Sequence, residues 1–207
     1  STANTAVANA SKAQSTADTA QATADNIEVG GRNLILDSKT NFENSNYPTG
    51  EYDLSEELQR GETYTYQIKG TPAEGSTCWL FYNYDGKSFG AFPCCGKYDS
   101  DKGIYYQTFL CRDVQTSPTD IIDRVNIYSY PQQTGKIATI EWVKLEKGNK
   151  ATDWTPAPED VDANITAVDS KVTTISTRTS TLENTTTGME SDVSALQTTI
   201  KTKADNS

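Results

Sequence analysis

The stretch IEWVKLEKGNKATDWTPAPED, residues 140–160, decides how this 207-residue chain is organised. It predicts the last strand of a β domain, then a compact loop, and then a stop at Pro156 and Pro158, residues that also suit the first turn of a helix. Directly after it, the apolar period changes from two to that of a heptad repeat. We therefore predict a β module that ends near residue 158 and a coiled-coil stalk over residues 159–207.

The sequence GGRNLILDS, residues 30–38, opens the same β module. Gly30 and Gly31 break the preceding helical pattern, and the residues that follow are rich in aromatic side chains. Strands are predicted at residues 34–36, 63–68, 77–84, 103–111, 124–130 and 136–146, with turn signals at 47–50 and 85–86. Short strands with no helical pattern between them predict one β-sandwich over residues 30–158.

An alanine seam precedes the β module over residues 1–29. Alanines recur at spacings of three and four from Ala3 to Ala24 and lead to Ile27, which is the pattern of a helix in a coiled coil. Alanine buries little area, so at about 25 cal/mol per Å² this seam is weakly cohesive. A disordered Ala/Thr/Ser linker is the alternative that the composition leaves open.

The stalk carries the most regular apolar pattern of the chain. Its seam residues are Val161, Ile165, Val168, Val172, Ile175, Thr179, Leu182, Thr186, Met189, Val193, Leu196 and Ile200. The residues between them are mostly poor helix formers, so the helix needs a partner that buries its seam. With Ile165 at heptad position a and Val161 at d, β-branched residues fill both positions in the first heptads, which favours a parallel homotrimer over a dimer. Roughly forty residues at about 1.5 Å each make a rod of about 60 Å, and heptads that run to the chain end predict a piece of a longer fibre-like protein.

Composition excludes several classes of function. The net charge of -10, without a basic cluster, argues against nucleic-acid partners. No run of about 18 apolar residues is present, which argues against membrane insertion, and the polar first residues lack the apolar segment of a signal peptide.

Histidine, the commonest general base, is missing. No acidic pair is placed by the sequence across a cleft as a glycosidase requires. We therefore predict no enzymatic activity, no catalytic residue and no cofactor, while a structural Ca²⁺ remains compatible with a sandwich.

The four cysteines, Cys78, Cys94, Cys95 and Cys111, leave three interpretations open. Buried thiols are the default, because cysteine is among the most buried residue types. One or two disulfides are the second interpretation. A zinc site is the third, although the usual C-x2-C spacing is missing.

The β segment holds more tyrosine and tryptophan than a core needs, which predicts an exposed aromatic surface on which sugar rings stack. Strand 77–84 has apolar residues on both faces, so alternation alone does not decide which face is buried. The glycine-rich loop over residues 85–98 is predicted to form one wall of a ligand site, and a packed loop is the alternative. The candidate ligand-binding residues are Trp79, Tyr82, Tyr84, Phe89, Phe92, Tyr98 and Tyr128.

The stretches at residues 30–38 and 141–160 resemble a module found in tail proteins of phages and prophages of Gram-positive bacteria. The resemblance implies a jelly-roll, carbohydrate-binding-like domain of the galactose-binding type, on tail-tip, baseplate or tail-associated lysin proteins, with trimeric coiled coil on either side. It also implies adhesion to host cell-wall polysaccharide, contact with other tail proteins, and a place in the virion after assembly in the bacterial cytoplasm. The family offers no catalytic residues, and its motif positions Lys144, Leu145, Glu146, Asp153 and Trp154 are interpreted as structural.

The sequence therefore predicts a non-enzymatic adhesion module displayed in several copies on a coiled-coil stalk. A structural spacer or collar of the tail fibre, without a ligand, is the alternative. An exposed patch of Trp and Tyr beside polar side chains would favour binding over a spacer. Two carboxylates about 5 to 10 Å apart in a cleft would indicate a glycan hydrolase instead.

Overall fold

The computed structural model of the chain describes residues 2–83, 96–111 and 121–205. These residues form, in order, α1 (Thr2–Asp25), β1 (Phe42–Asn44), β2 (Gly50–Asp53), β3 (Thr63–Thr71), β4 (Thr77–Asn83), β5 (Lys97–Asp99), β6 (Ile104–Leu110), β7 (Arg124–Tyr130), β8 (Ala138–Lys147) and α2 (Pro158–Asp205). The chain divides into two compact units, residues 1–160 and 161–207. Among the described helices, none combines the length and the apolar character needed to cross a membrane.

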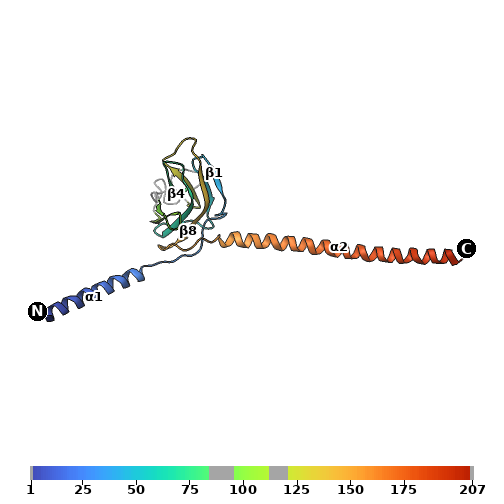
Figure 1. The fold of residues 1–207 in the computed structure, drawn as a ribbon, viewed down its shortest axis with the longest axis horizontal. Helices are drawn as coiled ribbons and strands as arrows, with labels where there is room; N and C mark the ends of the chain where they lie inside the picture. Colours follow the sequence, from blue (N-terminus) through green and yellow to red (C-terminus); the bar gives the residue numbers. More distant parts are fainter. Residues whose placement is uncertain (1, 84–95, 112–120, 206–207) are drawn as a thin grey trace. The chain divides into compact units, whose positions relative to one another are not determined.

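The strands make two antiparallel sheets that enclose one core (Figure 1). In the described residues, one sheet has five strands in the order β1-β8-β3-β6-β5, and the other has three in the order β2-β7-β4. Both sheets contribute to the core, for example through Tyr66 of β3, Val143 of β8, Leu80 of β4 and Ile127 of β7, none of which is more than 1% exposed. The prediction of a mainly β sandwich followed by a long C-terminal helix is confirmed.

The core resolves which face of β4 points inward. Cys78, Leu80 and Tyr82 are buried in the core cluster, whereas Trp79 and Phe81 are only half-buried. Because successive side chains of a strand point to opposite faces, Trp79 and Phe81 lie on the outer face of the three-stranded sheet.

Residues 34–36, predicted as the first strand, make only one isolated bridge, between Ile35 and Leu54. The N–H groups of these residues have three different kinds of acceptor. Leu34 N donates to Leu145 O at 2.8 Å, Leu36 N donates to Asp53 O at 3.0 Å, and Ile35 N donates to Asn33 Oδ1 at 3.1 Å. Because these acceptors lie in β8, in β2 and on a side chain, no ladder with one strand forms. Conversely, the short strands β1, β2 and β5 carry too few residues to show a period in the sequence, and none was predicted. The turn predicted at residues 85–86 lies outside the described residues.

The chain enters and leaves the sandwich through two segments that lie side by side, which we call the clasp: residues 26–30 and 148–150. Val29 and Lys150 form a parallel bridge. Asn149 ties the two segments together, because its Oδ1 accepts from Glu28 N at 3.0 Å and its Nδ2 donates to Asn26 O at 2.6 Å. The approach requires glycine at position 30, since a Cβ there would clash with the carbonyl oxygen of Lys147.

Candidate functional site

The outer face of the three-stranded sheet, which we call the open face, is set by the register of its strands. Across β4 and β7, Thr77 pairs with Tyr130, Trp79 with Tyr128, and Phe81 with Asn126. Strand β2 extends this face, because its outward residues Glu51 and Asp53 stand opposite Asn126 and Arg124. Aromatic rings therefore gather at one end of the open face, and charged and amide groups gather at the other.

Five rings on the open face form a continuous set of contacts, the aromatic row: Tyr47, Tyr128, Phe81, Trp79 and Tyr130. The ring centroids of Tyr47 and Tyr128 lie 4.6 Å apart, and those of Tyr128 and Phe81 lie 4.8 Å apart. Trp79 stacks on Phe81 at 5.8 Å and contacts Tyr130 at 4.4 Å. These distances fall within the range of favourable aromatic pairs, so the rings support one another without the help of the core.

The most exposed rings of the row are Tyr47 and Tyr130, each 41% exposed. Burial raises the pKa of the Tyr47 hydroxyl, and the nearby Tyr128 and Tyr130 raise that pKa further. The phenol groups of three tyrosines are therefore close enough to interact. Such a set offers ring faces for apolar contact and hydroxyl groups for hydrogen bonds at one place.

Buried polar atoms without a hydrogen-bond partner lie on the same face: Oγ1 of Thr77, Nε1 of Trp79 and Oδ1 of Asn126. Each such atom costs about 1–3 kcal/mol while it stays unpaired. A hydroxyl group both donates and accepts a hydrogen bond, so it can pair with the indole N–H as well as with the amide oxygen. Trp154, in the segment between β8 and α2, also has an unpaired Nε1, so an unpaired indole alone does not define a site. Trp79 differs because it stands in a row of rings.

Charged groups border the row. Arg124 Nε lies 3.1 Å from Asp53 Oδ1, and both side chains are well exposed. Glu51 is exposed beside Asn126. Within the described residues this border supplies carboxylate, guanidinium and amide groups, which are the groups that bind sugar hydroxyls.

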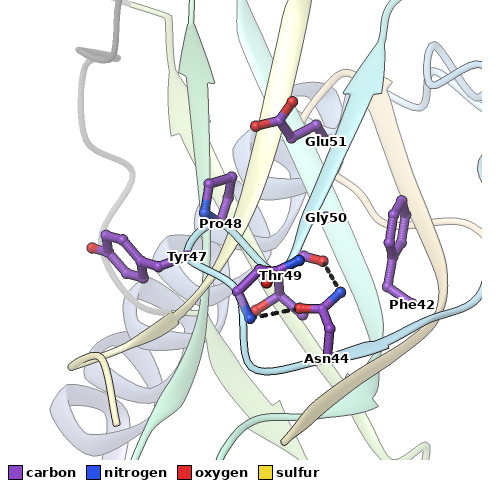
Figure 2. Close-up of a pocket in the computed structure, with 8 residues that line it drawn as sticks. Phe42, Asn44, Tyr47, Pro48, Thr49, Gly50 and Glu51 are labelled. Atoms are coloured by element: carbon purple, nitrogen blue, oxygen red, sulfur yellow. Dashed lines mark hydrogen bonds between the residues drawn. The ribbon is translucent and has the colours of Figure 1, made fainter. Parts of the chain in front are cut away.

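A pocket of about 360 Å³ adjoins the row at the loop between β1 and β2. Figure 2 shows Phe42 and Tyr47 on opposite sides of this segment, with Glu51 at the rim. Asn44 holds the loop, because its Nδ2 donates to Thr49 O at 3.1 Å and its Oδ1 accepts from Asn46 N at 2.9 Å. The volume is near the lower end for small-molecule sites, so the pocket is large enough for a small group at the end of the row.

The outer face of the five-stranded sheet is different, because residues 148–157, which we call the strap, cover it. Thr65 Oγ1 donates to Gly148 O at 2.9 Å, and Gln67 Nε2 donates to Thr152 O at 2.6 Å. Asn33 Nδ2 holds the far end of the strap by donating to Thr155 O at 2.9 Å. Thr65 and Gln67 point outward from the sheet, yet both are buried, as is Asn33.

Beneath the strap lies an ion pair between Lys144 Nζ and Glu146 Oε2 at 3.4 Å, with both side chains 0% exposed. Lys144 also donates to Thr152 Oγ1 and to Asp153 O. Glu146 accepts from Thr152 N at 2.7 Å and from Gly31 N at 2.8 Å. The motif residues Lys144 and Glu146 thus fix both the strap and the start of the module, and they are closed to any ligand.

The structure places the predicted ligand-binding residues in several different environments. Trp79 and Tyr128 belong to the aromatic row. Tyr82 does not, because its side chain lies in the core and is 1% exposed; its prediction as a surface residue is corrected. Tyr98 lies on β5 of the other sheet, where it contacts Tyr105 at 4.9 Å. Tyr84, Phe89 and Phe92 lie outside the described residues.

Three members of the row were not predicted: Tyr47, Phe81 and Tyr130. Tyr130 stands two residues after Tyr128 in one strand, so the period of two could have identified it. Phe81 follows from Trp79 by the same argument once the inward face of β4 is known. Tyr47 lies in a loop, and no sequence pattern connects it to the row.

Cys78 and Cys111 are buried in the core as thiols, while Cys94 and Cys95 lie outside the described residues. Burial raises the pKa of the Cys78 thiol to about 12. Within the described part of the chain, no three Cys, Asp or Glu side chains are arranged to hold a metal ion. The structural Ca²⁺ that the sequence allows therefore stays a prediction without a ligand set.

Comparison with known proteins adds no assignment: no family model matches this chain, and no curated protein matches it either. The resemblance to phage tail modules therefore rests on the two motifs quoted above, and the function is argued from the open face.

Proposed function

We propose that this chain is a non-enzymatic adhesion module that binds host cell-surface polysaccharide on its open face. The aromatic row is the observation that carries the proposal. A sandwich that serves only as a spacer has no need to hold five rings together outside its core, with two of them well exposed. Sugar rings stack on such side chains through their C–H faces, while amide and charged groups at the border bind the hydroxyls.

The polar atoms of the open face support a polyhydroxylated ligand over a purely apolar one. The exposed groups at the border, Glu51, Asp53 and Arg124, offer carboxylate and guanidinium groups that bind sugar hydroxyls and that an apolar ligand would leave unused. The acidic balance of the chain disfavours polyanionic partners such as nucleic acids. The resemblance to phage tail modules adds the expectation of a jelly-roll domain that contacts cell-wall polysaccharide.

The second part of the proposal is that the long helix α2 joins several copies of the module. Three copies, joined by their stalks as a parallel homotrimer, would present three weak sugar sites at once. Linked sites gain strongly in apparent affinity when they engage one polymer together. In this proposal the protein sits in the virion, at a phage tail tip or baseplate beside other tail proteins, without a cofactor and without a catalytic centre.

The test is the binding of the full chain to purified cell-wall polysaccharide from Gram-positive bacteria, by isothermal titration calorimetry. Tyr47→Ala and Tyr130→Ala remove the most exposed rings of the row. Tyr98→Ala is the matched control, because Tyr98 is an exposed tyrosine of the other sheet, 58% exposed. Thermal unfolding of each variant shows whether the sandwich remains folded.

We expect saturable binding that weakens about tenfold or more in each row variant and is unchanged in Tyr98→Ala. A tenfold loss corresponds to about 1.4 kcal/mol, which is in the range of one stacking contact. Equal losses in all three variants would place the site elsewhere. No binding to a broad panel of glycans by the assembled protein would favour the spacer or collar.

A further inference from the structure

The helix α2 exposes an apolar stripe along its whole length. The described seam residues Val161, Ile165, Val168, Val172, Ile175, Leu182, Met189, Val193, Leu196 and Ile200 are between 41% and 67% exposed. No residue of this 48-residue helix is buried. A helix of this length with one apolar stripe and poor intrinsic helix formers is stable only when the stripe is covered.

The charges of the helix identify what covers the stripe. Between residues 161 and 200 every charged residue falls at heptad position e or g, the two positions that flank the seam. Position e carries Asp162, Asp169, Glu183 and Glu190, and position g carries Lys171, Arg178 and Asp192. The remaining outward positions b, c and f are uncharged over this range. In coiled coils, residues at e and g form the contacts between chains that set partner and orientation.

We infer that α2 pairs with further copies of itself in parallel and in register, and that Arg178 forms an ion pair with Glu183 of the neighbouring copy. In a parallel coiled coil a residue at g faces the residue at e five positions further along the next chain. Arg178 at g thus faces Glu183. The other g residues face partners as follows: Asn164 faces Asp169, Lys171 faces Ser176, Thr185 faces Glu190, and Asp192 faces Gln197. This arrangement contains one attractive pair at each interface and no pair of like charges.

The antiparallel arrangement is disfavoured by the same charges. There, residues at e face residues at e of the partner, and all four charged e residues are acidic. Like charges at close range are destabilising. A parallel arrangement with a shift between chains does not close into a symmetric oligomer. The parallel, in-register form is therefore the one that agrees with both the charges and the requirement for closed symmetry.

The polar seam residue Thr186 does not oppose this arrangement. Thr186 stands at position a, and its hydroxyl donates to the carbonyl oxygen of Leu182 at 2.9 Å. The hydroxyl is therefore satisfied by its own helix and can be buried without a partner from another chain. Its methyl group remains available for packing in the seam.

This inference deepens the oligomeric part of the proposed function and does not depend on sugar binding. The two parts fail separately: a monomeric chain that still binds polysaccharide would overturn the inference alone. An assembled chain that binds no polysaccharide would overturn the adhesion proposal alone.

The test compares charge variants of the full chain by sedimentation equilibrium and by the thermal loss of helical circular dichroism. Arg178→Glu and Glu183→Arg each create a like-charge pair, and the double variant R178E/E183R restores an attractive pair. Lys171→Glu is the matched control, since it makes the same change of charge at the same heptad position but faces Ser176. Tryptophan fluorescence follows the sandwich in parallel, because all three tryptophans lie outside α2.

We expect each single variant to lower the melting temperature of the helix by several degrees and to weaken assembly. The double variant should recover the wild-type values, whereas an equal mixture of the two single variants should recover them only in part, because every mixed trimer keeps one interface with a like-charge pair. Lys171→Glu should change little. A monomeric wild-type chain would overturn the inference, as would equal losses for Lys171→Glu and Arg178→Glu, or a double variant that sums the two losses.

Discussion

The outer faces of the two sheets differ: that of the five-stranded sheet is covered, and that of the three-stranded sheet is not covered by the strap. On the five-stranded sheet, outward-pointing side chains such as Thr65, Gln67 and Lys144 are buried because the strap lies over them. On the three-stranded sheet, the outward-pointing residues form the aromatic row and an exposed charged border. The covered sheet uses its polar groups to hold its own chain, whereas the open face leaves polar atoms without partners in the unbound protein.

This difference separates residues that specify the fold from residues that are available for function. Trp142 and Trp154 contact each other at 6.0 Å beside the strap, and Lys39 lies 5.5 Å above the ring of Trp154. These two rings pack against residues of the covered sheet and its neighbouring segments, whereas the ring of Trp79 lies in the aromatic row on the open face. Aromatic residues are thus no guide to a binding site until the covered sheet is known.

The largest change in the free energy of unfolding is expected for a substitution of Glu146 on the covered sheet. Glu146→Gln leaves the ammonium group of Lys144 buried without a counter-charge, because both side chains are 0% exposed. Loss of one partner of a buried ion pair typically costs about 3–5 kcal/mol. Urea unfolding followed by tryptophan fluorescence measures this loss in the free energy of unfolding.

The control for this variant is Glu74→Gln, which breaks the exposed pair with Lys136 at 2.8 Å. Exposed pairs contribute less than about 1 kcal/mol. Equal effects of the two substitutions would mean that the strap does not exclude water from Lys144, and the contrast between the sheets would then be lost.

A smaller loss of stability is expected at alkaline pH, where the buried thiol of Cys78 on the inner side of β4 ionises. Burial raises the pKa of Cys78 from its ordinary value of 9.0 to about 12. The folded state therefore favours the neutral thiol, so stability is fully present below pH 9 and is lost as pH rises above 9, by about 1.4 kcal/mol per pH unit. Melting temperatures between pH 7 and 10.5 should fall more steeply for the wild type than for Cys78→Ala; parallel curves would contradict the raised pKa.

The outer side is tested by Asn126→Leu. Asn126 is 5% exposed, and its Oδ1 has no partner, so removal of the amide should leave stability unchanged or raise it by about 1 kcal/mol. Polysaccharide binding should change little, because Asn126 Oδ1 is buried in the unbound protein. A variant that loses stability would show that Asn126 belongs to the fold, as Asn33 does on the covered side.

The smallest effect is expected at the border of the open face. Asp53→Asn removes the ion pair with Arg124. The side chain of Asp53 is 69% exposed, and that of Arg124 is 44% exposed. The free energy of unfolding should change by less than about 1 kcal/mol. A larger loss, measured by urea unfolding at low and high salt, would indicate that this border supports the sheet and is not simply solvated.

Regular periodicity explains how much of the fold the sequence predicts. The strands β3, β7 and β8 each span seven or more residues, and the heptads of α2 repeat without interruption, so these elements were predicted. Residues 34–36 were predicted as a strand but form none, because their N–H groups donate to β8, to β2 and to the side chain of Asn33. Strands of three or four residues, such as β1 and β2, are too short to display a period.

Of the candidate residues predicted for ligand binding, only some lie together in the structure, and their role in binding stays a prediction. Trp79 and Tyr128 lie in the aromatic row, but Tyr82 lies in the core, because both faces of β4 are apolar and the sequence does not reveal what covers them. The inward face is decided by contacts with β3, β6 and β7, which are distant in the chain. Tyr47 enters the row from a loop, where no alternation applies, so only the tertiary structure could have located it.

The clasp has a mechanical consequence. The segments around Val29 and Lys150 run in parallel, one leading into the sandwich and one leading out. Tension on the two ends of the chain pulls these segments in opposite directions along their length, so their hydrogen bonds are loaded together in shear and do not open one at a time. Part of a force that travels along the chain is thereby carried by the hydrogen bonds of Asn149, after the contact of Asn33 Nδ2 with Thr155 O has been loaded.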